Sequence, residues 1–73
     1  MLEVFGIRVV TEQRLPARRL TTFWIAMAET ADEAVRIVEA TVGPGSDVEA
    51  TGHVFPAETI SDYDLRPGTA SPV

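Results

Sequence analysis

The sequence predicts an α+β fold, a small antiparallel three-stranded sheet with one main helix across one face. Three observations predict it. Two apolar segments rich in β-branched and aromatic residues come first, a charged, alanine-rich segment follows, and a segment of alternating polarity comes after that. The resulting order is strand, strand, helix, strand. Because strand–helix–strand crossovers are right-handed in nearly all proteins, we expect the first strand in the middle, with strand order 2-1-3, as in half of a ferredoxin-like fold.

Residues 2–11 form the first predicted strand, because apolar side chains occupy both of its alternating faces. One face carries Phe5, Ile7 and Val9, and the other carries Leu2, Val4 and Val10. Such two-faced apolarity is typical of a central strand. The polar segment around Pro16 predicts a loop over 12–18. A second apolar strand over 20–28 then completes a hairpin with the first.

The switch into a helix after Thr30 is the clearest local signal in the chain. Thr30 is an N-cap residue, and Glu33 stands three positions later, as in a capping box. Apolar residues then recur at helical spacing, at Ala31, Ala34, Val35, Val38 and Val42. Gly43 and Pro44 end the helix, since glycine accepts a left-handed conformation and proline cannot continue the hydrogen-bond ladder.

The third strand is predicted over 47–55, where one face is more polar than the other, as expected near a sheet edge. The segment 57–65 has room for a short C-terminal helical turn, anchored by Ile60, Tyr63 and Leu65. Pro67 and Gly68 predict a turn after it. We therefore expect a single domain over 1–68 and a C-terminal tail over 69–73.

Composition narrows the classes of protein. The chain of 73 residues has no cysteine, which excludes a disulfide framework and thiolate zinc sites. Its net charge of −5 argues against a general attraction to nucleic acid or to anionic lipid. It shows no signal-peptide pattern and no apolar run near the roughly 20 residues that span a bilayer, so we expect a cytoplasmic protein. All six basic residues are arginine, which indicates GC-rich codon usage and a bacterial source.

Few residues suit catalysis or metal binding. The one histidine, His53, lies on the polar face of a predicted strand, where a histidine is most often solvated. The serines lie in no recognisable nucleophile motif. The aspartates Asp47, Asp62 and Asp64 match no calcium-binding spacing. We therefore expect no catalytic residue, no cofactor and no bound metal.

The hairpin loop holds the only concentration of basic residues, Arg14, Arg18 and Arg19. These arginines suit contacts with a nucleic acid or with an acidic partner protein. The simpler interpretation is a solvated loop whose arginines pair with nearby carboxylates or with those of a neighbouring subunit. Without a basic helix or interleaved aromatic residues, and with a negative net charge, binding of nucleic acid is the weaker interpretation.

Trp24 is the remaining residue of interest. A tryptophan in the middle of a strand usually belongs to the core. One helix of about 12 residues, however, cannot cover both faces of a three-stranded sheet. We therefore expect an apolar patch on the open face, and such patches mark interfaces or ligand surfaces. The patch predicted from the sequence consists of Val4, Val10, Leu20, Trp24 and Ala26.

These features lead to two hypotheses of function. The first is a small, non-catalytic bacterial binding or assembly module that self-associates through its open sheet face or its edge strand. Its partner is then a second copy or another small protein. The alternative is an oligomeric small-molecule binder or minor enzyme, with a site between subunits near Trp24 and Arg19. A flat, dry apolar face favours the first hypothesis, and a pocket with converging polar groups favours the second.

Overall fold

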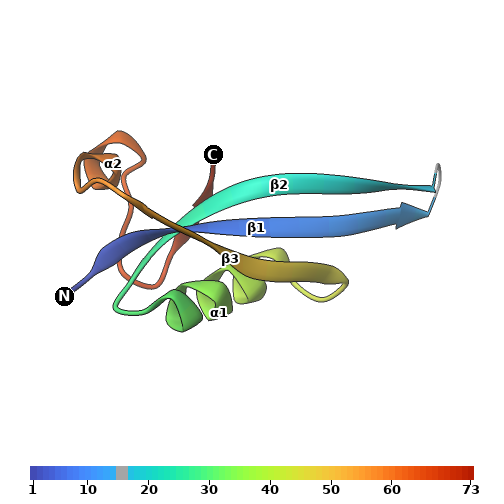
Figure 1. The fold of residues 1–73 in the computed structure, drawn as a ribbon, viewed down its shortest axis with the longest axis horizontal. Helices are drawn as coiled ribbons and strands as arrows, with labels where there is room; N and C mark the ends of the chain where they lie inside the picture. The colour runs from blue at the N-terminus through green and yellow to red at the C-terminus, as the bar shows by residue number, and fades with distance from the viewer. Residues whose placement is uncertain (15–16) are drawn as a thin grey trace.

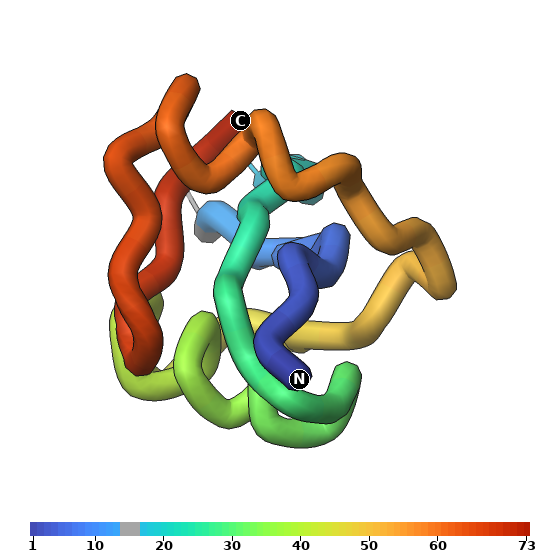
Figure 2. The backbone as a smooth tube through the Cα atoms, turned by 90° about the vertical axis from the view of Figure 1, so that its left-hand side faces the viewer, coloured from blue at the N-terminus to red at the C-terminus, as the bar shows by residue number. Residues whose placement is uncertain are grey.

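The computed structural model describes residues 1–14 and 17–73 and contains six elements of secondary structure (Figure 1). In chain order these are β1 (Glu3–Arg14), β2 (Ala17–Ala28), α1 (Ala31–Val42), β3 (Ser46–Phe55), α2 (Glu58–Asp62) and β4 (Ala70–Pro72). The strands form one sheet in the order β3-β1-β2-β4, and every neighbouring pair is antiparallel. The long helix lies on one side of the sheet and the short one on the other (Figures 1 and 2).

The prediction of a three-stranded sheet with order 2-1-3 is therefore wrong, although the α+β class is compatible with the structure. The missing element is β4, which adds to the outer edge of β2. It lies within the five residues that we expected to form a tail. A three-residue strand without an apolar pattern has no signal that distinguishes it from a loop.

A tight turn brings β4 back to the sheet. Pro67 presets the backbone of the turn, and Gly68 adopts the positive φ of 81° that follows it in a type II turn. The Thr69 amide donates to the Arg66 carbonyl at 3.1 Å, and the Thr69 hydroxyl donates to the same oxygen at 2.7 Å. The turn predicted at Pro67 and Gly68 thus directs the chain along β2.

The hairpin of β1 and β2 is longer than the sequence predicts. Its pairs run without interruption from Glu3 with Ala28 to Arg14 with Ala17. Most of the predicted loop over 12–18 is therefore strand. These residues are polar on both faces because neither face is covered there, so the alternation that reveals a half-buried strand is missing.

Helix α1 begins and ends where the sequence predicts. The Thr30 side chain accepts a hydrogen bond from the Glu33 amide at 3.2 Å, and Gly43 follows the last turn with φ of 79°. The apolar side of α1 packs on one face of the sheet, where it forms the first core cluster. Its buried members are Ile7, Val9, Ala26, Ala28, Ala34 and Val38.

The opposite face has a smaller core under the segment that contains α2. Val4, Ile25 and Leu65 are its buried members, with Phe55 and Ile60 packed against them. A Schellman motif ends α2: the Leu65 amide donates to the Ile60 carbonyl at 2.9 Å, and the Asp64 amide donates to the Ser61 carbonyl at 3.3 Å. The motif directs Leu65 into this core.

Replacement of Thr30 by alanine is expected to lower the free energy of unfolding by about 1 kcal/mol, because the Glu33 amide loses its side-chain acceptor. Chemical denaturation followed by circular dichroism measures this change. Thr30→Ser keeps the hydroxyl and serves as the control. Equal stability of Thr30→Ala and the wild type would show that this cap contributes nothing.

A second prediction concerns Asp64, the only described residue other than glycine with a positive φ, at 51°. Glycine adopts this conformation without steric cost, so Asp64→Gly is expected to raise stability by up to about 1 kcal/mol. Asp62→Gly, inside α2, is the matched control and should lower stability by roughly 0.5–1 kcal/mol. Thermal melts compare the two, and destabilisation by both would contradict the assignment.

Candidate interaction surface

The distal part of the hairpin projects from the body as an arm, made of residues 12–14 of β1 and 17–22 of β2 (Figure 1). Only its end, residues 12–14 and 17–19, is two-stranded, because residues 9–11 of β1 also pair with β3. Every residue of β2 from Ala17 to Phe23 is exposed, whereas Ile25 to Ala28 are buried. Strand β3 pairs with β1 only as far as Thr11, opposite Ser46. More than half of β2 thus extends beyond both core clusters.

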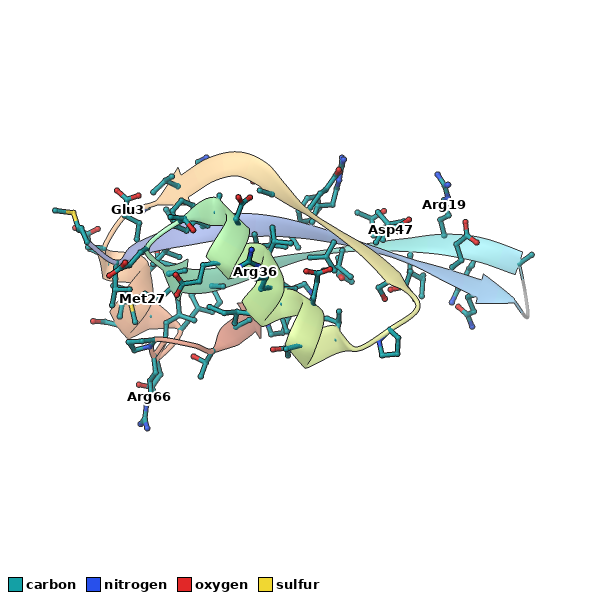
Figure 3. All side chains as sticks on the ribbon, turned by 90° about the horizontal axis from the view of Figure 1, so that it is seen from below. Glu3, Arg19, Met27, Arg36, Asp47 and Arg66 are labelled. Carbon is teal, nitrogen blue, oxygen red and sulfur yellow. The ribbon has the colours of Figure 1, made fainter. Side chains whose placement is uncertain are left out.

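The arm differs in charge from the rest of the chain. It contains three arginines and one glutamate, a net charge of +2. Because the net charge of the whole chain is −5, the remaining residues carry a net charge of −7. Figure 3 shows Arg19 on the arm, distant from Arg36 on α1. The arm is therefore a basic projection on an acidic body.

Two of the arm's arginines reach across the hairpin toward β1. The Nε group of Arg18 donates to Oε1 of Gln13 at 2.9 Å, and Nε of Arg19 lies 3.6 Å from Oε1 of Glu12. All four side chains border a shallow hollow of about 330 Å³. The Arg14 side chain, the third member of the predicted basic loop, lies outside the described part. These cross-strand contacts point the arginines away from the outer edge of β2.

That outer edge is covered for only part of its length. Strand β4 pairs with β2 from Ala26 to Trp24, and the Val73 amide donates to the Phe23 carbonyl at 2.8 Å. In the described chain, no strand pairs with the outer edge of residues 17–22. Six residues of β2 therefore present a bare strand edge.

A groove lies on the sheet face opposite α1, near the root of the arm. It encloses about 330 Å³ and is lined by Gly6, Ile7, Phe23, Trp24, Thr51, His53, Phe55 and Val73. The rings of His53 and Phe55 meet edge to face with centroids 4.5 Å apart. Among the described residues that line the groove, His53 has the only titratable side chain, and acid–base chemistry between two side chains would need a second one.

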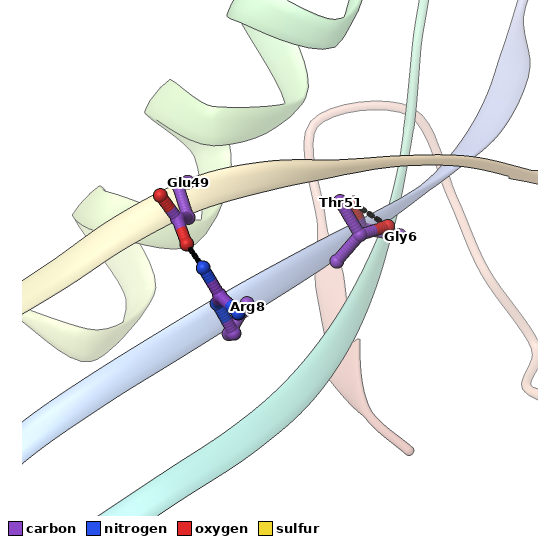
Figure 4. Close-up of polar contacts among 4 residues, drawn as sticks. All are labelled: Gly6, Arg8, Glu49 and Thr51. Carbon is purple, nitrogen blue, oxygen red and sulfur yellow. Dashed lines mark hydrogen bonds and ion pairs between the residues drawn. The ribbon is translucent and has the colours of Figure 1, made fainter.

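The floor of the groove depends on a close approach to Gly6. The Thr51 hydroxyl donates to the Gly6 carbonyl at 3.1 Å, and beside it an ion pair links Arg8 to Glu49 (Figure 4). Here β3 contains a bulge, because the register shifts between Phe5 and Ile7 of β1. Gly52, with φ of 83°, makes the bulge possible without steric cost.

The five residues of the predicted apolar patch lie on different faces. Leu20, Trp24 and Ala26 are on the α1 face, where Ala26 is buried and Trp24 is half-buried against the core. Val4 and Val10 are on the opposite face, and Val4 is buried in the second core cluster. The structure therefore does not bring the five together, and only Leu20 is exposed, at 39%.

The register of the hairpin explains this distribution. Ile7 pairs with Trp24, so odd residues of β1 share a face with even residues of β2. The predicted patch took even-numbered residues from both strands and therefore combined residues of opposite faces. Phe23, at 52% exposure, is the large apolar residue of β2 that this combination missed. A single known pair of opposite residues would have fixed the register and revealed Phe23. The sequence between the two strands does not define such a pair.

The residues considered for chemistry remain apart. The Ser46 hydroxyl and the Thr11 hydroxyl are hydrogen-bonded at 2.8 Å, where β3 begins to pair with β1. Among the residues that the structure describes, no three His, Asp or Glu side chains gather as metal ligands would. No helix in the same part of the chain is long and apolar enough to cross a membrane.

Comparison with known proteins identifies no relative: no protein-family model, no curated protein and no solved structure matches the chain significantly. The arm, its bare edge and the groove are consequently interpreted from their own geometry.

Gly6→Ala is expected to lower the free energy of unfolding by about 1–3 kcal/mol, because the added methyl group overpacks a close contact. A Cβ atom at this position would lie 2.8 Å from Oγ1 of Thr51 and 3.1 Å from Cε2 of Phe55. Denaturant titration of Gly6→Ala, Thr51→Ala and the double variant tests the cause. In the double variant, removal of the Thr51 hydroxyl should restore part of the stability that Gly6→Ala loses. Additive changes in the free energy of unfolding for the two single variants would contradict the proposed clash.

Proposed function

We propose that this chain is a non-catalytic assembly module that self-associates through its arm. The single observation that carries the proposal is the exposure of β2 from Ala17 to Phe23 within one continuous strand whose other end is buried. An isolated two-stranded hairpin is marginally stable in water at best. A hairpin with strands of twelve residues that extends so far beyond its core is well suited to contact a partner.

The size of the chain supports the same conclusion. Small domains without disulfides or metals often gain burial from a partner subunit. The exposed apolar side chains of the arm and its root, Leu20 and Phe23, supply the area that such burial requires. They stand beside hydrogen-bonding groups of the bare strand edge, so that apolar and backbone contacts are available to one partner.

The alternative function, a small-molecule site near Trp24 and Arg19, has less support. The two residues are five positions apart on β2, about 17 Å along the strand, and they lie on opposite faces of the sheet. The Trp24 indole N–H donates to the Thr22 hydroxyl at 3.2 Å. In the described part of the chain Arg19 borders the hollow on the arm and Trp24 borders the groove at its root, so the two residues do not share a pocket, and the assembly module is the better interpretation.

Sedimentation velocity over a concentration series tests the proposal. The wild-type chain is expected to form dimers as its concentration rises through the micromolar range. A double variant, Leu20→Ser with Phe23→Ser, should weaken association at least about tenfold, because roughly 1.4 kcal/mol of apolar contact corresponds to that factor.

The control is Val54→Ser on β3, since Val54 is similarly exposed, at 47%, but lies away from the arm. It should associate like the wild type. Equal weakening in the control would place the interface elsewhere, and a wild-type monomer at every concentration would exclude self-association.

A further inference from the structure

The exposed strand edges of the sheet differ in how they are protected. Strand β4 carries Pro72 opposite Trp24, and a proline has no N–H to offer to a further strand. Strand β3, at the other end of the sheet, is interrupted by the bulge at Gly52. Bulges and prolines are the means by which proteins prevent edge-to-edge pairing. The outer edge of β2 over 17–22 has neither.

The direction of each backbone group on this edge follows from one hydrogen bond. The Phe23 carbonyl accepts from the Val73 amide, so the backbone groups of Phe23 point outward. In a strand, the N–H and C=O groups of alternate residues point to the same side. Thr21 and Arg19 therefore also point outward, while Leu20 and Thr22 direct their backbone groups to β1.

Only one register suits a two-fold pairing of this edge with itself. A two-fold axis at Thr21 or Thr22 would require the Phe23 backbone, whose carbonyl already bonds Val73. An axis at Arg18 or Arg19 would place identical arginines directly opposite each other, which is destabilising. An axis at Leu20 pairs Arg19 with Thr21 of the second copy and brings the two Leu20 side chains together. This pairing ends at residues 18 and 22, because the next position, opposite Phe23, is occupied by Val73.

We propose that two copies of this chain pair their β2 edges antiparallel over residues 18–22, with the two-fold axis at Leu20. This inference rests on the proposed function and specifies its interface. The outward groups of Arg19 and Thr21 supply the inter-chain hydrogen bonds, and the two sheets of four strands become one continuous sheet. Both α1 helices then lie on the same face, since opposite residues of antiparallel strands share a face.

The placement of the arginines favours this arrangement over pairing in the same direction. Antiparallel pairing lays the two arms side by side in opposite directions, so Arg18 and Arg19 of each copy lie opposite Thr22 and Thr21 of the other. No arginine of the paired segment therefore faces an identical arginine. Arg18 and Arg19 lean toward β1 through Gln13 and Glu12, which leaves the edge accessible. Parallel pairing of the same edge in register would place Arg18 and Arg19 beside their own copies.

Disulfide cross-linking tests the register, because the chain has no cysteine of its own. In the proposed dimer the two Leu20 residues form a non-hydrogen-bonded pair with Cα atoms about 4.5 Å apart, within the range that a disulfide spans. Leu20→Cys is expected to form a covalent dimer under mild oxidation. Thr22→Cys is the matched control, exposed on the same face of the same strand. Its two copies would be separated by roughly 14 Å along the strands, so it should remain monomeric on a non-reducing gel.

A second variant tests the edge itself. Thr21→Pro removes an outward N–H without removing a bond to β1, and proline is tolerated on an edge strand. It should abolish dimerisation in sedimentation while the far-ultraviolet circular dichroism of the fold is retained. If Thr21→Pro does not fold, the comparison of Leu20→Cys with Thr22→Cys still decides whether the proposed register is correct.

The two levels of the proposal fail in distinguishable ways. A wild-type dimer in which Leu20→Cys cross-links no faster than Thr22→Cys would overturn the edge pairing and leave self-association standing. A wild-type chain that stays monomeric at high micromolar concentration would overturn both.

Discussion

The pairing of β1 with β2 is the interaction on which the rest of the structure depends. Twelve successive pairs hold the hairpin in one register, from Glu3 with Ala28 to Arg14 with Ala17. A shift by one residue would move every side chain of one strand to the other face. The register therefore decides that Ile7 and Ala26 meet α1, and that Val4 and Ile25 meet the segment of α2.

Strand β1 is paired along both edges and is apolar on both faces, so each face must be covered by another element. The two covering elements differ in length. Helix α1 covers one face with twelve residues, while the other has the five residues of α2 and the Schellman turn at Leu65. Strand β4 closes only three positions of the β2 edge. All three covers lie at the same end of the hairpin. The opposite end is left as the arm, and it is exposed because none of these three covers reaches it.

Local chemistry made part of this fold predictable. Thr30 and Gly43 mark the ends of α1 through their own capping interactions, which need no tertiary information. The face assignment of Trp24 was not predictable in the same way, because it depends on which residue of β1 lies opposite, and the apolar pattern of both strands is two-sided. Strand β4 and the length of the arm were missed since they bury little, and a strand that buries little has no apolar alternation to reveal it. The same property makes the arm, and not the core, the part of the chain available to a partner.

The protection of the edges carries this reasoning one step further. A bare strand edge is a liability in a soluble protein, and natural sheets interrupt, charge or cover it. Strand β3 contains a bulge at Gly52 and strand β4 contains Pro72, so the strands at both ends of the sheet carry features that hinder pairing with a further strand. The arm carries arginines, whose charge discourages indiscriminate pairing of the edge. Their side chains contact β1 and leave the backbone groups of Arg19 and Thr21 accessible. Repulsion between identical arginines disfavours the registers centred on them, and the Val73 contact at Phe23 blocks those centred nearer the body. The features that protect the β2 edge from indiscriminate pairing thus also favour the pairing proposed above, the two-fold contact at Leu20.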